Sequence, residues 1–178
     1  MALPSRGPSL GAIALLAILV VVLLSGGDED DGDRPAASGE GPRRGIVVPV
    51  ADIVDGDTIE VLVDGTEEDV RYIGVDTPES VKPGAPVECF GPEASDFNER
   101  LVGGERVRLE FGPERRDDYG RLLAYVYVGD RFVNADLVRR GYATTLTIAP
   151  NDQFAPLFDR LEQEAGNAGR GLWSACGP

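Results

Sequence analysis

An Asp-Gly pair between two runs of strand-forming residues constrains the fold of this chain more than any other feature. The runs are "TIEVLV", residues 58–63, and "VRYIGV", residues 70–75, and Asp64-Gly65 opens the stretch between them. Asp-Gly is a strong hairpin signal, because a tight turn between strands needs residues that accept a positive φ. We therefore predict that residues 58–63 and 70–75 are antiparallel neighbours.

The rest of the chain beyond residue 45 alternates between strand-like and helix-like stretches. Alternating and β-branched runs mark strands, whereas apolar residues at helical spacing, with proline in a first turn or glycine after a last one, mark helices. Further strands are expected at residues 45–54, 106–111 and 122–128, and helices at residues 92–102, 133–140 and 156–167. Five strands with interspersed helices suit a small closed or partly closed β-barrel, an α+β fold.

The first 44 residues differ in composition from the rest. Residues 10–24 are uncharged and apolar, with Arg6 before them and "DEDDGD" after them. A run of this length suits either a cleaved signal peptide or an uncleaved membrane anchor, and both interpretations stay open. The flanking charges indicate that the body of the protein lies outside the cytoplasm. We expect three parts: residues 1–25, an acidic disordered linker at 26–44, and one domain at 45–178.

Cys89 and Cys176 are the only cysteines. In an exported protein such a pair favours a disulfide, which here would tie the start of the first helix to the C-terminus. A bond closing a loop of that length contributes roughly 4 kcal/mol in the chain-entropy model. Two buried free thiols are the alternative.

Missing residue types exclude several chemistries. The chain has no histidine, so it has no Ser-His-Asp or Cys-His triad, and two cysteines cannot form the usual zinc site. Lys82 is the only lysine and no GxxxxGK[ST] motif occurs, which excludes a P-loop. Carboxylates, arginines, tyrosines and a metal that prefers oxygen ligands remain for catalysis.

The charge of the chain argues against a general affinity for nucleic acids. The formal net charge is −14, and the residues after position 45 still carry 25 acids against 13 bases. Phosphate binding normally leaves a basic surface. An anionic substrate would therefore have to meet a locally positive pocket.

Two carboxylates are expected to meet at one end of the predicted hairpin. Asp57 directly precedes the first strand and Asp76 directly follows the second, so both lie beyond the same end of the ladder. Adjacent carboxylates repel each other, and a divalent cation relieves the conflict because Ca²⁺ and Mg²⁺ prefer oxygen ligands. The plainer alternative is that both are ordinary turn and strand-end residues.

Two arginines and a glutamate could complete a site for phosphodiester chemistry. Arg71 lies on the second strand, and Arg121 leads into the strand at residues 122–128. A guanidinium stays charged and bonds two phosphate oxygens at once, and Glu79 could orient or deprotonate a water molecule. Surface ion pairs are the alternative for both arginines.

Six motifs together resemble the staphylococcal nuclease (thermonuclease) family. In order, they are "VDGDTIEV", "VRYIGVDTPE", "FGPEASDF", "DDYGRLLAYVYV", "VNADLVRRGYA" and "GLW", and they span about Val47 to Trp173. The resemblance implies an OB-fold five-stranded β-barrel with three helices. It also implies Ca²⁺-dependent cleavage of DNA and RNA that leaves 3′-phosphate ends.

Carried over by position, the resemblance implies the ligands of the metal. Asp57 and Asp76 match the side-chain Ca²⁺ ligands, and Thr77 matches the ligand that binds through its backbone carbonyl. Glu79 resembles the residue proposed as general base, with orientation of the attacking water as the alternative role.

The resemblance also implies how the substrate is held, and two departures from it. Arg71 and Arg121 match the two phosphate-binding arginines, and Tyr119 matches a tyrosine beside the terminal phosphate. Asp118 stands where the best-known member of the family has a lysine. Residues 143–150 lack two tyrosines that pack near the bound base, so we expect weaker substrate binding.

Two functions are compatible with these features. The first is a monomeric nuclease, secreted or tethered to the membrane by its N-terminal segment. The second is a non-catalytic OB-fold module at the cell surface that binds nucleic acid or protein. The acids and arginines named above favour the nuclease, whereas the net acidity favours the binding module.

Overall fold

The computed structural model describes residues 45–80, 84 and 86–176. The expected signal or anchor segment and the acidic linker lie outside these residues. Within them, no helix is both long enough and apolar enough to cross a membrane.

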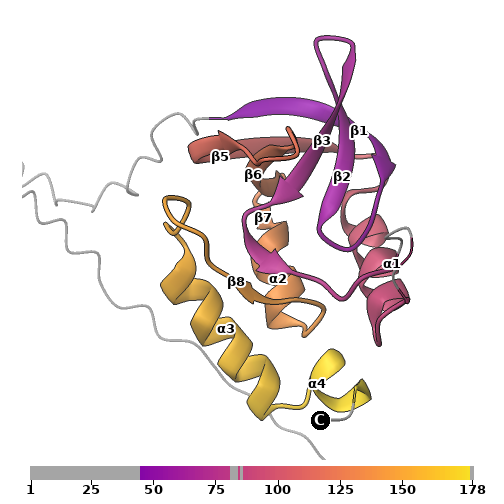
Figure 1. The fold of residues 1–178 in the computed structure, drawn as a ribbon, viewed down its shortest axis with the longest axis vertical. Coiled ribbons are helices and arrows are strands. Elements are labelled where there is room, and N and C mark those ends of the chain that lie inside the picture. Colours follow the sequence, from indigo (N-terminus) through magenta and orange to yellow (C-terminus); the bar gives the residue numbers. More distant parts are fainter. Residues whose placement is uncertain (1–44, 81–83, 85, 177–178) are drawn as a thin grey trace, which may run out of the picture. The chain divides into compact units, whose positions relative to one another are not determined.

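Eight strands and four helices make up the described part of the chain (Figure 1). In order they are β1 (Ile46–Ile53), β2 (Thr58–Val63), β3 (Thr66–Tyr72), β4 (Gly74–Asp76), α1 (Gly91–Val102), β5 (Arg106–Arg116), β6 (Leu122–Val128), β7 (Arg131–Phe132), α2 (Val133–Arg139), β8 (Thr144–Leu146), α3 (Ala155–Asn167) and α4 (Leu172–Ala175). The expected strands and helices are present except that the strand expected at residues 70–75 is divided between the end of β3 and β4, and the short elements β7, β8 and α4 are additions.

Five of the strands close into a barrel. The main sheet has the order β3-β2-β1-β5-β6-β7, and β3 also pairs with β6 in parallel, which joins the two sides of the sheet. Alternate residues of each strand point inward, so Ile59, Val61 and Val70 are fully buried. The predicted OB-fold barrel with accompanying helices is confirmed.

The hairpin forms at the predicted turn but in a different register. Asp64 and Gly65 have φ values of 54° and 82°, as a two-residue hairpin turn requires. A turn this short makes β3 begin at Thr66, and Thr58 pairs with Arg71. The predicted pairing of residues 58–63 with 70–75 was therefore wrong, because the polar stretch after the turn continues the ladder on its solvent face.

After β3 the chain bends away from the barrel at Gly74. Its φ is +80°, and a Cβ there would lie 2.5 Å from the ring of Phe158, so both backbone and packing favour glycine. After this bend β4 pairs with β8, placing Asp76 opposite Thr144. Asp76 consequently reaches the end of the barrel from this small second sheet.

The helices cover one end of the barrel and are linked to it by buried polar groups. Asn98 of α1 accepts a hydrogen bond from the Tyr72 hydroxyl at 2.9 Å and donates one to the Asp55 carbonyl at 2.9 Å. Since buried polar groups are costly when unpaired, these bonds fix α1 against the loop before β2.

The predicted disulfide is confirmed. Cys89 and Cys176 are bonded across a sequence separation of 87 residues. The bond connects the segment before α1 with the residue after α4.

Candidate active site

Asp57 is held inside the barrel end by its own turn. Its N–H donates to the Asp55 carboxylate at 2.9 Å, and Asp57 as a whole is only 4% exposed. A Cβ at Gly56 would lie 2.7 Å from the Thr77 hydroxyl oxygen, so glycine lets the two segments approach. The sequence "DGD" thus directs one carboxylate inward and uses the other as a brace.

The Asp57 carboxylate lies between Arg71 and Thr77. Its Oδ1 is 3.1 Å from Arg71 Nε, and its Oδ2 accepts hydrogen bonds from the Thr77 N–H at 2.7 Å and the Thr77 hydroxyl at 3.1 Å. Burial raises the pKa of Asp57 to about 7, although Arg71 opposes the shift, and Asp55 and Asp76 add to it. Further positive charge next to Asp57 would therefore stabilise the ionised form of its carboxylate.

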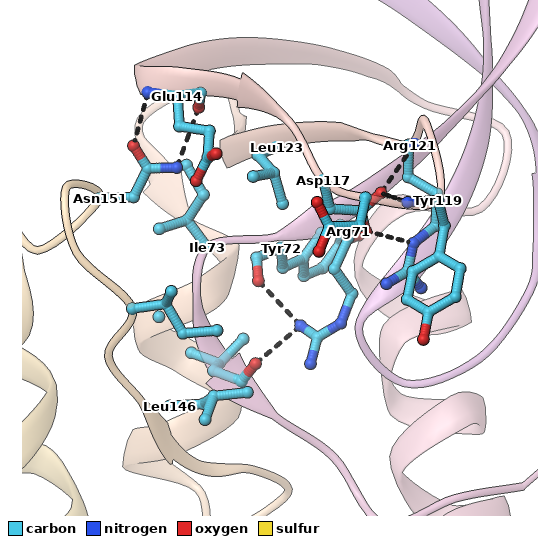
Figure 2. Close-up of a pocket in the computed structure, with 14 residues that line it drawn as sticks. Arg71, Tyr72, Ile73, Glu114, Asp117, Tyr119, Arg121, Leu123, Leu146 and Asn151 are labelled. Atoms are coloured by element: carbon cyan, nitrogen blue, oxygen red, sulfur yellow. Dashed lines mark hydrogen bonds and ion pairs between the residues drawn. The ribbon is translucent and has the colours of Figure 1, made fainter.

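Arg71 connects the two candidate metal-binding carboxylates. Its Nη2 is 2.7 Å from Asp76 Oδ1, and its Nη1 donates to the carbonyls of Tyr72 at 2.8 Å and Val75 at 2.7 Å. Figure 2 shows the guanidinium held by these two carbonyls. Because β3 ends and the chain turns at Gly74, the residues after Arg71 wrap around its own side chain.

Arg121 is oriented by an aspartate that the sequence did not single out. Asp117 accepts hydrogen bonds from Arg121 Nε at 2.7 Å and from the N–H groups of Tyr119 and Arg121, both at 3.0 Å (Figure 2). The signal for this role was present, since an aspartate four residues before an arginine across a Tyr-Gly turn can form such a brace. The Tyr119 ring is 87% exposed, with the guanidinium of Arg121 5.5 Å from its centroid.

A cavity of about 320 Å³ brings the two arginines together. Arg71, Tyr119 and Arg121 line one part, and Leu146 lies in another part (Figure 2). The lining also includes Ile148, and both apolar side chains are exposed. The lining also includes three carboxylates, those of Glu114, Asp117 and Asp118. Two guanidiniums and three carboxylates therefore share the lining, and the locally positive pocket expected for an anionic substrate stays a prediction.

A second brace that the sequence did not reveal stabilises the far wall of this cavity. The Asn151 amide accepts a hydrogen bond from the Glu114 N–H at 3.1 Å and donates one to the Glu114 carbonyl at 2.9 Å (Figure 2). A Cβ at Gly112 would collide with the Asn151 side chain. The pair links β5 to the segment before α3.

Asp57, Asp76 and Thr77 lie together, but they form no larger acidic cluster. Within the described residues, no group of three or more histidine, cysteine, aspartate or glutamate side chains is arranged to hold a metal. The Asp76 side chain is 55% exposed, whereas Asp57 is buried. Two carboxylates and a nearby main-chain carbonyl are hard oxygen donors of the kind that Ca²⁺ binds.

Glu79 is not among the residues that line the cavity of Arg71 and Arg121, and neither are Asp57 and Asp76. Glu79 follows Thr77 by two residues, and its main chain is bonded to Glu88. The structure therefore places Glu79 beside the acid pair and outside the arginine cavity.

Comparisons with known proteins agree with this geometry. A family model described as "Staphylococcal nuclease homologue" matches residues 69–175. The chain is 40% identical over 161 residues to a thermonuclease of Staphylococcus intermedius, covering 90% of this chain and 95% of that protein. It is also 43% identical over 126 residues to the endonuclease YncB of Bacillus subtilis (strain 168), covering 70% of this chain and 60% of that protein.

The closed barrel, the paired arginines and these matches define the class of the protein as an OB-fold nuclease. More specifically, the chain belongs to the staphylococcal nuclease family.

Proposed function

We propose that the protein is a Ca²⁺-dependent nuclease that hydrolyses phosphodiester bonds of DNA, RNA or both and leaves 3′-phosphate ends. One observation carries this proposal: Arg71 contacts both Asp57 and Asp76 and shares a cavity with Arg121. A phosphate between the two guanidiniums would lie beside the acid pair. The names of the relatives, thermonuclease and endonuclease, support the same reaction class.

The donor set supports a divalent cation. Asp57, Asp76 and the Thr77 carbonyl would hold it, and Asp57 is a buried acid whose ionised form burial disfavours. The excess of acids in the arginine cavity also favours a bound cation, since the cavity otherwise offers little net attraction to a phosphate. When bound, Ca²⁺ supplies positive charge that polarises a phosphoryl oxygen.

The two arginines have separate tasks in this proposal. Arg71 is fixed by the carbonyls of Tyr72 and Val75, so its position is set before substrate arrives. Arg121 is held through Nε by Asp117, which directs its terminal nitrogens to other partners. Fixed cationic donors stabilise the charge that develops on the non-bridging phosphate oxygens without reorganising.

Glu79 would act on the attacking water. Water oxygen bonds to phosphorus, the bond from phosphorus to the 5′-oxygen breaks, and the leaving oxygen takes up a proton. Glu79 either orients the water or accepts its proton, and a positioned carboxylate of this kind contributes about 10²–10⁴ in rate.

We further propose that the protein works outside the cytoplasm as a monomer, secreted or held at the membrane by its N-terminal segment. The Cys89–Cys176 disulfide supports this, because such bonds persist in oxidising compartments.

A calcium-titrated digestion tests the proposal. The full chain is incubated with denatured DNA and with RNA at increasing Ca²⁺, with EDTA as the control. Cleavage that requires Ca²⁺, and fragments whose 3′ ends are extended by a polymerase only after phosphatase treatment, are the expected results. Binding without cleavage at any Ca²⁺ concentration would instead favour a non-catalytic module.

A further inference from the structure

Glu88 binds the main chain of Glu79 on both sides. The Glu79 N–H donates to Glu88 Oε2 at 3.0 Å, and the Glu88 N–H donates to the Glu79 carbonyl at 2.8 Å. These two hydrogen bonds join the ends of the stretch between residues 79 and 88. The first of them has a charged acceptor and belongs to the stronger kind.

The segment that carries Glu88 is itself anchored. Cys89 is bonded to Cys176, and the Phe90 ring stacks on Tyr142 with 5.2 Å between centroids. A Cβ at Gly91 would lie 2.5 Å from the Glu79 carbonyl oxygen, so the start of α1 packs directly against Glu79. Glu79 therefore rests on residues that the disulfide ties to the C-terminus.

The same elements border the candidate metal ligands. A second cavity of about 320 Å³ is lined by Asp76 and Thr77 together with Glu88 and the two cysteines. The disulfide thus forms part of the wall of the space next to Asp76 and Thr77. A change in the position of the disulfide would therefore affect both Glu79 and this wall.

We propose that Glu88, anchored by the Cys89–Cys176 disulfide, is a positioning residue that fixes Glu79 for its action on the attacking water. The inference rests on the proposed nuclease function. Glu79 directly follows Pro78 and lies, partly exposed, in an irregular segment beyond the end of β4, so no strand ladder fixes its position. The bonds from Glu88 hold it instead, and the disulfide keeps Glu88 in place.

Replacement of Glu88 separates positioning from general stability. Glu88→Ala is expected to lower kcat by about tenfold or more with KM within about twofold, since small misplacements of a reacting group can cost up to about 10² in rate. Glu88→Gln is expected to retain most of kcat, because its amide oxygen still accepts the Glu79 N–H. Glu99→Ala, on the exposed face of α1, is the matched control and should leave kcat unchanged.

Removal of the disulfide tests whether the anchor acts through Glu88. The double variant Cys89→Ser with Cys176→Ser is expected to lose kcat while its circular dichroism stays native at low temperature. Adding Glu88→Ala to this variant should then lower kcat by less than it does in the wild-type protein, because both changes release the same residue. Fully additive losses would mean that the disulfide acts elsewhere and would overturn its part of the proposal.

Amide exchange measures directly whether Glu88 holds the main chain of Glu79, and it does not depend on activity. In the full chain, the Glu79 N–H should be protected from hydrogen exchange, and Glu88→Ala should raise its exchange rate at least tenfold while Glu88→Gln does not. If the exchange rate of the Glu79 N–H and kcat are both unchanged in Glu88→Ala, the proposal is overturned. If the wild-type protein cleaves no nucleic acid, the nuclease function fails, and the exchange data still show whether Glu88 holds Glu79.

Discussion

The Nε of Arg71 lies 3.1 Å from Oδ1 of Asp57, a carboxylate that is almost completely buried. The same guanidinium also reaches Asp76, so it stands between the two acids and compensates part of their mutual repulsion. A cation bound by these acids and a phosphate bound by Arg71 would therefore both interact with the same three charged side chains.

Arg71→Ala should lower kcat by roughly 10³-fold or more, as expected for loss of an arginine that stabilises transferring phosphoryl oxygens. Arg71→Lys should restore little of the rate, because an ammonium cannot bond two oxygens in one plane. The measurement is kcat at saturating Ca²⁺. Arg100→Ala, an exposed arginine on α1, is the control, and an Arg71→Ala rate near that of Arg100→Ala would refute the assignment.

Asp117→Ala should lower kcat by a smaller factor than Arg121→Ala does, because it leaves the Arg121 charge in place and removes only its brace at Nε. The effect on the free energy of unfolding should stay near 1 kcal/mol or below, since the pair is partly exposed. Steady-state kinetics and urea denaturation check both parts. Asp118→Ala, in the same turn, is the control, because the side chain that bonds Arg121 is that of Asp117; equal losses in both variants would contradict the bracing role.

Calcium should stabilise the wild-type protein against heat, because a ligand that binds only the folded state adds about 2.7 kcal/mol at 100 times its Kd. Asp57→Asn should remove most of that increase, since it takes one carboxylate from the donor set. Calorimetry with and without CaCl₂ measures the shift in Tm. Asp64→Asn in the hairpin turn, where asparagine tolerates the positive φ, should keep the full shift; equal shifts in both variants would rule out Asp57 as a ligand.

Alkaline pH should ionise two tyrosines only as the protein unfolds. Burial raises the pKa of Tyr72 above its usual range and also raises the pKa of Tyr125. Because their pKa values are higher in the folded state, they favour folding below about pH 10, and stability falls as pH rises beyond that value. Their tyrosinate absorbance should follow the loss of far-ultraviolet circular dichroism, and Tyr72→Phe should remove one tyrosine's share. Ionisation of both well before unfolding would contradict this.

Leu146→Tyr or Ile148→Tyr should strengthen substrate binding. Both positions line the arginine cavity with exposed apolar side chains, 40% and 61% exposed respectively, where a ring can be added without crowding the core. Stacking of one base on an aromatic ring contributes about 1–3 kcal/mol, so KM for single-stranded DNA should fall by about fivefold or more at similar kcat. Val87→Tyr, at an exposed site that does not line this cavity, is the control, and an unchanged KM in both cavity variants would argue against base stacking there.

The parts of the fold that depend on local pattern could be predicted from the sequence. The bounds of β2 and β6 match the expected strands, because alternation and β-branched residues mark them clearly. The pairing of β4 with β8 could not be predicted. It joins two three-residue strands far apart in sequence, and it depends on the bend at Gly74 and on where α3 packs.

The site was predictable to a similar degree. The hairpin turn indicated that Asp57 and Asp76 approach each other, although the correct register and the route through β4 differ from the expected ladder. The bridging position of Arg71 could not be predicted, since it depends on side-chain torsions that no spacing rule fixes, whereas the spacing of Asp117 and Arg121 was a signal for the brace that the prediction did not use. Membership of the staphylococcal nuclease family, inferred from motif order, is confirmed.

The parallel pairing of β3 with β6 makes the candidate active site a composite of two stretches of chain. Arg71 lies within this seam opposite Leu123, and Arg121 directly precedes its other strand. A fragment ending at α1 would carry the acids and one guanidinium, and the remaining fragment would carry the other. Neither fragment alone would be active, and activity would return only when β3 of one fragment pairs with β6 of the other. Fragment complementation would therefore report directly on closure of the barrel.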